Sequence, residues 1–77
     1  MNNRTNYNRL KIVLAERGRT SRWLAGQMNK NENTISRWCV NKAQPSLAQL
    51  DEIARLLGVD ARDLIRSTAD VEKEEEK

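Results

Sequence analysis

The chain has 77 residues, of which 32% are charged and 38% hydrophobic, and its net charge is +3. This length allows one domain with one small hydrophobic core. With no histidine and a single cysteine, an intrachain disulfide and Ser-His-Asp or Cys-His catalysis are excluded. No residues have zinc-ligand spacing, no apolar run approaches the roughly 18 residues of a membrane span, and no signal-peptide pattern is present. We therefore expect a cytoplasmic protein that is not an enzyme, does not meet a membrane and needs no metal or cofactor.

The positive charge is concentrated in one part of the chain. Residues 9–42 contain eight basic and two acidic side chains, a net charge of +6. Residues 43–69 have a net charge of −1, and residues 70–77 have −3. A basic face is the electrostatic footprint of phosphate binding, although a merely solvated basic surface would give the same distribution. Charge alone therefore favours a nucleic-acid partner without establishing one.

One proline, three glycines and few β-branched runs favour an all-α fold. Residues 1–6 are polar and are interpreted as a flexible N-terminal arm. Residues 7–17 have apolar side chains at helical spacing, which predicts a first helix that Gly18 ends in a left-handed conformation. The apolar positions of this helix are Tyr7, Leu10, Val13 and Leu14.

A second helix is expected to follow at once, with Thr20 or Ser21 as its N-cap. It has an apolar face at helical spacing. Asn29 then lies where the chain must reverse, and asparagine is the residue that best tolerates a left-handed backbone after glycine. The apolar face of the second helix consists of Leu24, Ala25 and Met28.

A third helix is predicted over residues 31–40, with Asn31 as its N-cap. Its inward face is expected to be Ile35, Trp38 and Cys39. The other face carries polar side chains that a core does not need, namely Glu32, Asn33, Ser36 and Arg37. Asparagine and arginine form bidentate hydrogen bonds with adenine and guanine edges in a major groove. Residues 20–41 therefore predict a helix-turn-helix whose recognition helix is Asn31–Val40.

The rest of the chain predicts two more helices and a tail. After a connector at residues 42–45, Ser46 and Gln49 have the spacing of a capping box. The fourth helix that follows has the apolar stripe Leu47, Leu50, Ile53, Ala54 and Leu57, and Gly58 ends it. Asp60 is a second N-cap, for a short fifth helix with Leu64 and Ile65 facing inward. The domain is thus expected over residues 7–69, followed by an acidic tail at 70–77.

Several phrases in this order carry a family likeness. They are S-R-W-L-A (21–25), N-T-I-S-R-W (33–38), Q-P-S-L (44–47), L-D-E-I-A-R-L-L-G-V (50–59) and D-A-R-D-L-I (60–65). Together they resemble the phage-repressor and Cro-like helix-turn-helix family, also called the xenobiotic-response-element type. The likeness runs from about Leu10 to Ile65. It implies a compact five-helix, lambda-repressor-like domain that binds a double-stranded DNA operator as a homodimer, with its third helix in the major groove.

The resemblance also implies roles for individual residues. The positions that match the base readers are Glu32, Asn33 and Arg37. Glu32 would accept a hydrogen bond from a cytosine amino group, or would only stabilise the dipole of its own helix. The residues implied at the DNA backbone are Thr20, Ser21, Arg22, Lys30, Asn31, Thr34, Asn41 and Lys42.

The chain departs from the family pattern at two pairs of positions. Leu14 and Cys39 stand where relatives have an arginine and a glutamate that form an internal ion pair, so both partners are apolar here and no charge is left unpaired. Cys39 is therefore interpreted as a small core residue in preference to a redox sensor. Arg19 replaces an apolar residue and Trp23 a polar one, which suggests a cation–π contact, or alternatively a tryptophan that packs on a partner.

Two functions fit this pattern. The first is a sequence-specific DNA-binding transcriptional regulator, acting as a repressor. The second is an antitoxin that binds a protein partner and represses its own operon with the same fold. No toxin-wrapping segment is visible beyond the last eight or so residues, which favours the first function. Trp38 has the helix position of a core residue, in preference to one that stacks on a base.

Overall fold

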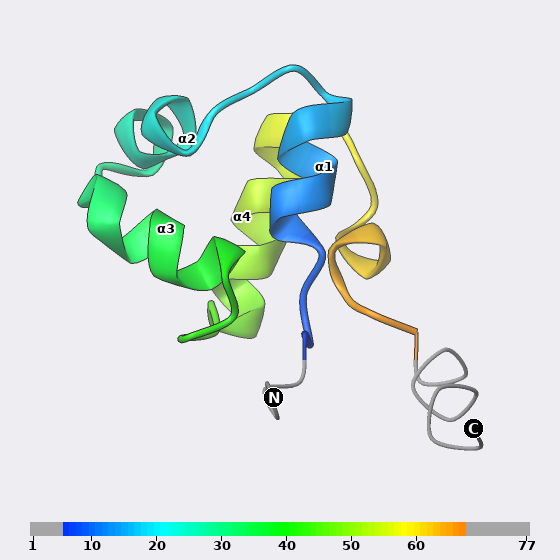
Figure 1. Ribbon diagram of the computed structural model, residues 1–77. Coiled ribbons are helices and arrows are strands. Elements are labelled where there is room, and N and C mark those ends of the chain that lie inside the picture. Colours follow the sequence, from blue (N-terminus) through cyan, green and yellow to red (C-terminus); the bar gives the residue numbers. More distant parts are fainter. Residues whose placement is uncertain (1–5, 68–77) are drawn as a thin grey trace.

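A computed structural model describes residues 6–67 of the chain (Figure 1). The predicted arm, apart from Asn6, and the acidic tail at 70–77 lie outside these residues. The described part contains four α-helices and one short 3-10 helix. These are α1 (Leu10–Glu16), α2 (Ser21–Met28), α3 (Glu32–Cys39), α4 (Leu47–Leu57) and the 3-10 helix η1 (Ala61–Leu64). The all-α prediction is confirmed, but the count of five α-helices is not, because the fifth element is a single 3-10 turn.

The helices are arranged around one apolar core. Helices α2 and α3 pack on each other on one side of the domain, and η1 lies on the far side of α1 (Figure 1). Helix α3 also contacts α1, and η1 contacts both α1 and α4. The buried apolar side chains are Leu10, Val13, Leu14, Leu24, Ala25, Met28, Ile35, Trp38, Leu50, Ile53, Ala54, Leu57 and Leu64. Most of the predicted inward faces are therefore confirmed.

The predicted start of the first helix is wrong by three residues. Helix α1 begins at Leu10, and the side chain of Tyr7 is 62% exposed. Residues 7–9 run alongside the end of the domain instead: Arg66 N donates to Tyr7 O at 2.8 Å, and Arg9 N donates to Leu64 O at 2.8 Å. This pairing uses the backbone groups that a helix would need, so the helix can start only after it.

Two aliphatic side chains predicted to face inward are exposed. Ile65 follows η1 in an extended conformation and forms a one-residue antiparallel bridge with Asn8. Leu47 is the first residue of α4, and its side chain is 81% exposed. The core layer on this helix begins one turn later, at Leu50. Helical spacing thus identified the correct stripe but not where the neighbouring elements stop covering it.

The predicted helix caps are confirmed. Thr20 Oγ1 accepts from Trp23 N at 3.0 Å, and Asn31 Oδ1 accepts from Asn33 N at 2.7 Å. Ser46 and Gln49 form the reciprocal capping box, with bonds of 3.1 and 2.7 Å. Local sequence therefore decides where α2, α3 and α4 begin.

Candidate nucleic-acid interface

The turn between α2 and α3 is built from local interactions. Asn29 has φ = 55° and ψ = 44°, the left-handed conformation that the sequence predicted. Its N–H donates to Gly26 O at 3.3 Å, and Lys30 N donates to Ala25 O at 2.9 Å. These bonds satisfy two of the last carbonyl groups of α2, and the left-handed residue reverses the chain, so that Asn31 can cap α3 two residues later.

Helix α3 has one buried face and one exposed polar face. Ile35 and Trp38 are in the core, so Trp38 is a packing residue and not a base-stacking one. Glu32, Asn33 and Arg37 are all exposed. Within residues 6–67, their side chains make no hydrogen bond or ion pair. The structure therefore brings the three predicted readers together on one solvent-facing surface with free polar groups.

The predicted phosphate contacts lie at the edges of this surface, with one exception. Arg22, Lys30 and Lys42 are exposed, on α2 and on the turns that flank α3. Ser21 and Thr34 are half-buried. Thr20 and Asn31 are exposed, and each uses one oxygen as a helix cap. The Asn31 amide nitrogen and the Thr20 hydroxyl proton stay available as donors.

Asn41 is the exception, because its side chain is turned into the protein. It has φ = 61° and is 8% exposed. Its Oδ1 accepts from the backbone N–H of Asn8 at 3.0 Å and from Gln44 Nε2 at 3.0 Å. Its Nδ2 donates to Asn8 O at 3.2 Å. Both polar atoms of the Asn41 side chain are thus bonded within the domain, and this buried side chain is not presented to a phosphate. We call the side chains of Asn8, Asn41 and Gln44 the amide cluster.

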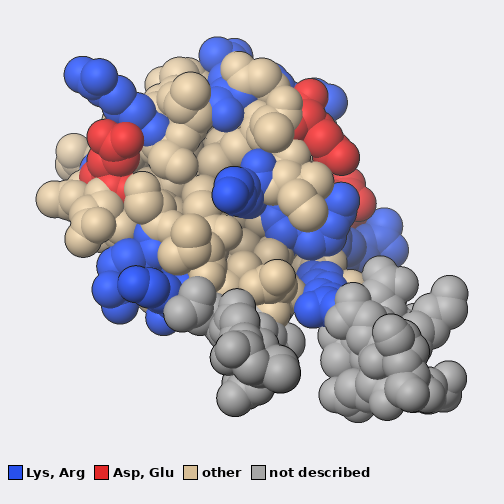
Figure 2. Space-filling model, viewed as in Figure 1, with Lys and Arg blue, Asp and Glu red and all other residues tan. Residues whose placement is uncertain are grey.

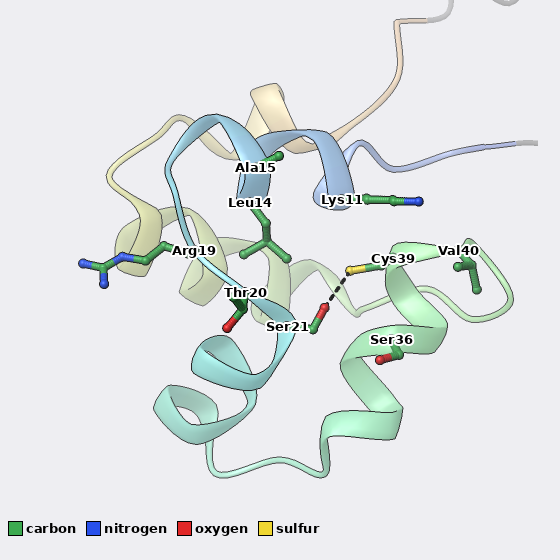
Figure 3. A pocket seen from close by; sticks show the side chains of 9 residues that line it. All are labelled: Lys11, Leu14, Ala15, Arg19, Thr20, Ser21, Ser36, Cys39 and Val40. Carbon is green, nitrogen blue, oxygen red and sulfur yellow. Dashed lines mark hydrogen bonds between the residues drawn. The ribbon is translucent and has the colours of Figure 1, made fainter.

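A groove of about 330 Å³ opens between α1, the start of α2 and the outer edge of α3 (Figure 3). Leu14 and Cys39 both line it, as expected for two residues that replace one ion pair. Cys39 Sγ lies 3.5 Å from Ser21 Oγ. Lys11 and Arg19 stand at opposite ends of the groove with their charged groups pointing away from it (Figure 3). The residues that line it are Lys11, Leu14, Ala15, Arg19, Thr20, Ser21, Ser36, Cys39 and Val40.

Three polar residues of this groove, Lys11, Arg19 and Ser36, were not among the predicted DNA contacts. Lys11 lies on a helix outside the helix-turn-helix, so no local motif pointed to it. The guanidinium carbon of Arg19 lies 4.4 Å from the centroid of the Trp23 ring, which confirms the expected cation–π contact. This contact holds the charge of Arg19 beside the start of α2, where the predicted phosphate contacts Thr20 and Ser21 also lie.

The charges around this surface are mostly unpaired cations. Figure 2 shows Lys and Arg side chains at several places on the face formed by α1, α2 and α3, with acidic side chains at its margins. The two ion pairs among residues 6–67 are elsewhere: Arg55–Asp51 at 2.9 Å on α4, and Arg62–Asp60 at 3.1 Å at η1. The basic side chains of α2 and α3 thus have no acidic partner in the described part of the chain and remain free to meet phosphates.

No helix in residues 6–67 has the length and hydropathy to cross a membrane. In the same residues, no three His, Cys, Asp or Glu side chains are grouped as metal ligands.

Comparison with known proteins adds to this geometry. A family model described as the Cro/C1-type helix-turn-helix DNA-binding domain matches residues 9–70. A search of the curated proteins finds no match. Among solved structures, the crystal structure of a Bacteroides fragilis protein, named as a candidate DNA-binding protein, is 65% identical with a TM-score of 0.77. This match covers 78% of the present chain and 97% of that chain.

Proposed function

Because the chain belongs to the Cro/C1-type helix-turn-helix DNA-binding family, we propose that it is a sequence-specific transcriptional regulator that represses genes by occupying an operator. The observation that carries this proposal is the exposed face of α3. The side chains of Glu32, Asn33 and Arg37 share that face. Within residues 6–67 these side chains make no hydrogen bond or ion pair, and the cations that border them have no acidic partner.

The readers act through the donors and acceptors that they present. Arg37 donates two hydrogen bonds to O6 and N7 of a guanine, and Asn33 pairs with N6 and N7 of an adenine. Glu32 accepts from a cytosine amino group. Each such pair is worth about 1–3 kcal/mol of discrimination against a wrong base.

The backbone contacts set the position of α3 in the groove and supply affinity that does not depend on sequence. We assign this role to exposed or half-buried groups at the rim, and we leave out Asn41 because its side chain is bonded inside the domain. The proposed set is Thr20, Ser21, Arg22, Lys30, Asn31, Thr34 and Lys42. Each phosphate neutralised releases counterions, so binding weakens as salt rises.

A homodimer fits the size of this surface. One helix of eight residues reaches only a few base pairs, which is too little to select one site in a genome. Two copies on a pseudo-palindrome, with half-sites about 34 Å apart, double the sequence that is read. A dimer bound in this way covers a promoter and blocks transcription.

Selection of duplexes from a random DNA library tests the proposal. The enriched motif should be symmetric. Arg37→Ala should cost roughly 1–3 kcal/mol on the enriched site and relax one base position. Lys42→Ala should weaken all duplexes alike and lower the salt slope by about one unit. If Arg37→Ala weakened specific and random duplexes equally, Arg37 would not be a reader, and if no motif were enriched, the proposed function would be wrong.

A further inference from the structure

The amide cluster joins the segment before α1 to the end of the recognition helix. Asn8 Nδ2 donates to the carbonyl oxygen of Trp38 at 2.9 Å and to Gln44 Oε1 at 2.8 Å. The bonds between Asn8 and Asn41 complete the cluster. Asn8 is 7% exposed, and none of the buried side-chain nitrogen or oxygen atoms in residues 6–67 lacks a partner. Breaking one of the bonds of Asn8 would leave a buried donor or acceptor unpaired. The amide cluster therefore holds the two segments rigidly together.

The amide cluster holds the C-terminal end of α3, which carries the proposed reader Arg37. Arg37 O accepts from Lys42 N at 2.9 Å and from Ala43 N at 3.3 Å. Trp38 O accepts from Asn41 N at 3.1 Å in addition to the bond from Asn8. The backbone of Arg37 and that of Lys42 are therefore fixed by the same turn that Asn8 fastens to the rest of the domain.

The other end of α3 is held differently. It is attached to α2 through the Asn29 turn, and α2 in turn packs mainly on α3. These two helices thus form a unit, and α1 and the amide cluster connect that unit to the remaining helices. The direction of α3 relative to Lys11 on α1, and relative to a second copy on DNA, depends on this connection.

We infer that Asn8 is a positioning residue for DNA recognition: it contacts no base or phosphate, and it fixes where the end of α3 presents Arg37 and Lys42. This inference rests on the proposed function of the α3 surface. It assigns a role to a side chain outside the helix-turn-helix, 30 residues from the carbonyl group that it holds. Loss of the Asn8 side-chain bonds should therefore reduce discrimination between DNA sequences more than it reduces the sequence-independent affinity for DNA.

The variant Asn8→Ser removes the side-chain bonds of the amide cluster without disturbing the start of α1. Asn8 Oδ1 also accepts from Leu10 N at 3.0 Å, and a serine hydroxyl can keep this local bond but is too short to reach Trp38 O. The change leaves the net charge unaltered. Ile53→Val is the matched control, because it trims a fully buried side chain on α4 and lowers stability without touching the cluster.

The readout is the ratio of affinities for the duplex selected by the wild-type protein and for a scrambled duplex of equal length. It is measured at fixed salt and at a temperature where circular dichroism shows each protein folded. Asn8→Ser should lower this ratio roughly threefold to thirtyfold, whereas Ile53→Val should leave it unchanged. In combination with Arg37→Ala, Asn8→Ser should have a smaller effect than alone, because the reader that it positions is already gone.

An unchanged ratio in folded Asn8→Ser, or an equal fall in Ile53→Val, would overturn the inference while leaving the proposed function intact. If Asn8→Ser does not fold, Gln44→Leu tests the inference instead. Gln44 is exposed and is one partner of Asn8, so this variant should also lower the affinity ratio. Failure of the wild-type protein to prefer any duplex would instead contradict the proposed function itself.

Discussion

The two turns that flank α3 use the same residue in the same conformation for different purposes. Asn29 before the helix has φ = 55°, and Asn41 after it has φ = 61°. Asn29 is exposed, and its turn is closed by backbone bonds to residues 25 and 26. Asn41 is buried, and its side chain bonds to Asn8, which is 33 residues away in the chain. In the first turn asparagine only adopts the left-handed backbone conformation, and in the second its side chain also forms tertiary hydrogen bonds.

This difference predicts where glycine can replace an asparagine that has a positive φ. Where only the backbone conformation matters, glycine should do as well as asparagine, because it adopts positive φ without strain. Where the side chain holds a buried network, glycine supplies the conformation and still leaves the partners unpaired.

Asn41→Gly should destabilise the domain by roughly 2–4 kcal/mol, because it removes the partner of the buried backbone N–H and C=O of Asn8 and also the acceptor of the Gln44 amide. The backbone conformation is preserved, so the loss measures the side chain alone. Urea unfolding followed by circular dichroism gives the free energy of unfolding. A loss below about 0.5 kcal/mol would mean that water replaces the Asn41 amide at little cost and that the two turns are equivalent.

Asn31→Ala removes the cap at the start of α3, where Asn31 Oδ1 accepts from Asn33 N. The expected cost is about 1 kcal/mol in the free energy of unfolding. Asn31→Ser, which keeps a capping oxygen, is the control and should stay close to the wild type. Equal losses in both variants would show that the Asn31 amide contributes something other than the cap.

Asn29→Gly should change the free energy of unfolding by less than about 0.5 kcal/mol, since glycine is the other residue favoured at this position. Asn29→Ala should cost more, about 1 kcal/mol, because it keeps a Cβ in the left-handed region without the local hydrogen bonds of asparagine. The same urea experiment measures both. A large loss in Asn29→Gly would contradict the view that this turn is purely local.

Asp60 provides the smallest test, at a third turn that is also exposed and local. Hydrogen bonds from the Arg62 side chain and backbone lower the pKa of the Asp60 carboxyl below its ordinary value of 3.8. A folded-state pKa below the unfolded one stabilises the protein above about pH 4, and this stabilisation is lost as the pH falls through the folded-state pKa. The Tm difference between the wild-type protein and Asp60→Asn should therefore shrink below about pH 4. A difference that is constant from pH 7 to pH 2.5 would contradict the lowered pKa.

The same contrast explains how much the sequence could predict. The caps at Thr20, Asn31 and Ser46 depend on residues two or three positions away, and the structure confirms all three. Left-handed Asn29 was predicted as well, because asparagine tolerates a positive φ better than any residue except glycine. Features of this kind are determined by residues only a few positions apart in the sequence.

What the sequence did not predict depends on distant partners. The late start of α1, the extended Ile65 and the inward Asn41 side chain all result from contacts with segments at least 33 positions away. An asparagine that caps, one that faces DNA and one that holds a buried network look alike in a single sequence. For the same reason the exposed polar face of α3 could be predicted from helical spacing, whereas the position of Lys11 beside the groove could not.

The bridge between Asn8 and Ile65 places the two ends of the described domain next to each other. Neighbouring ends make a domain suitable for circular permutation and for insertion into a loop of another protein. A peptide that joins residue 67 to residue 6 would span a short gap, and the chain could then be opened at the exposed turn around Asn29. The permuted protein would still be one chain, beginning with α3 and ending with α2, so the helix-turn-helix would no longer be continuous in sequence although its core partners stayed in place.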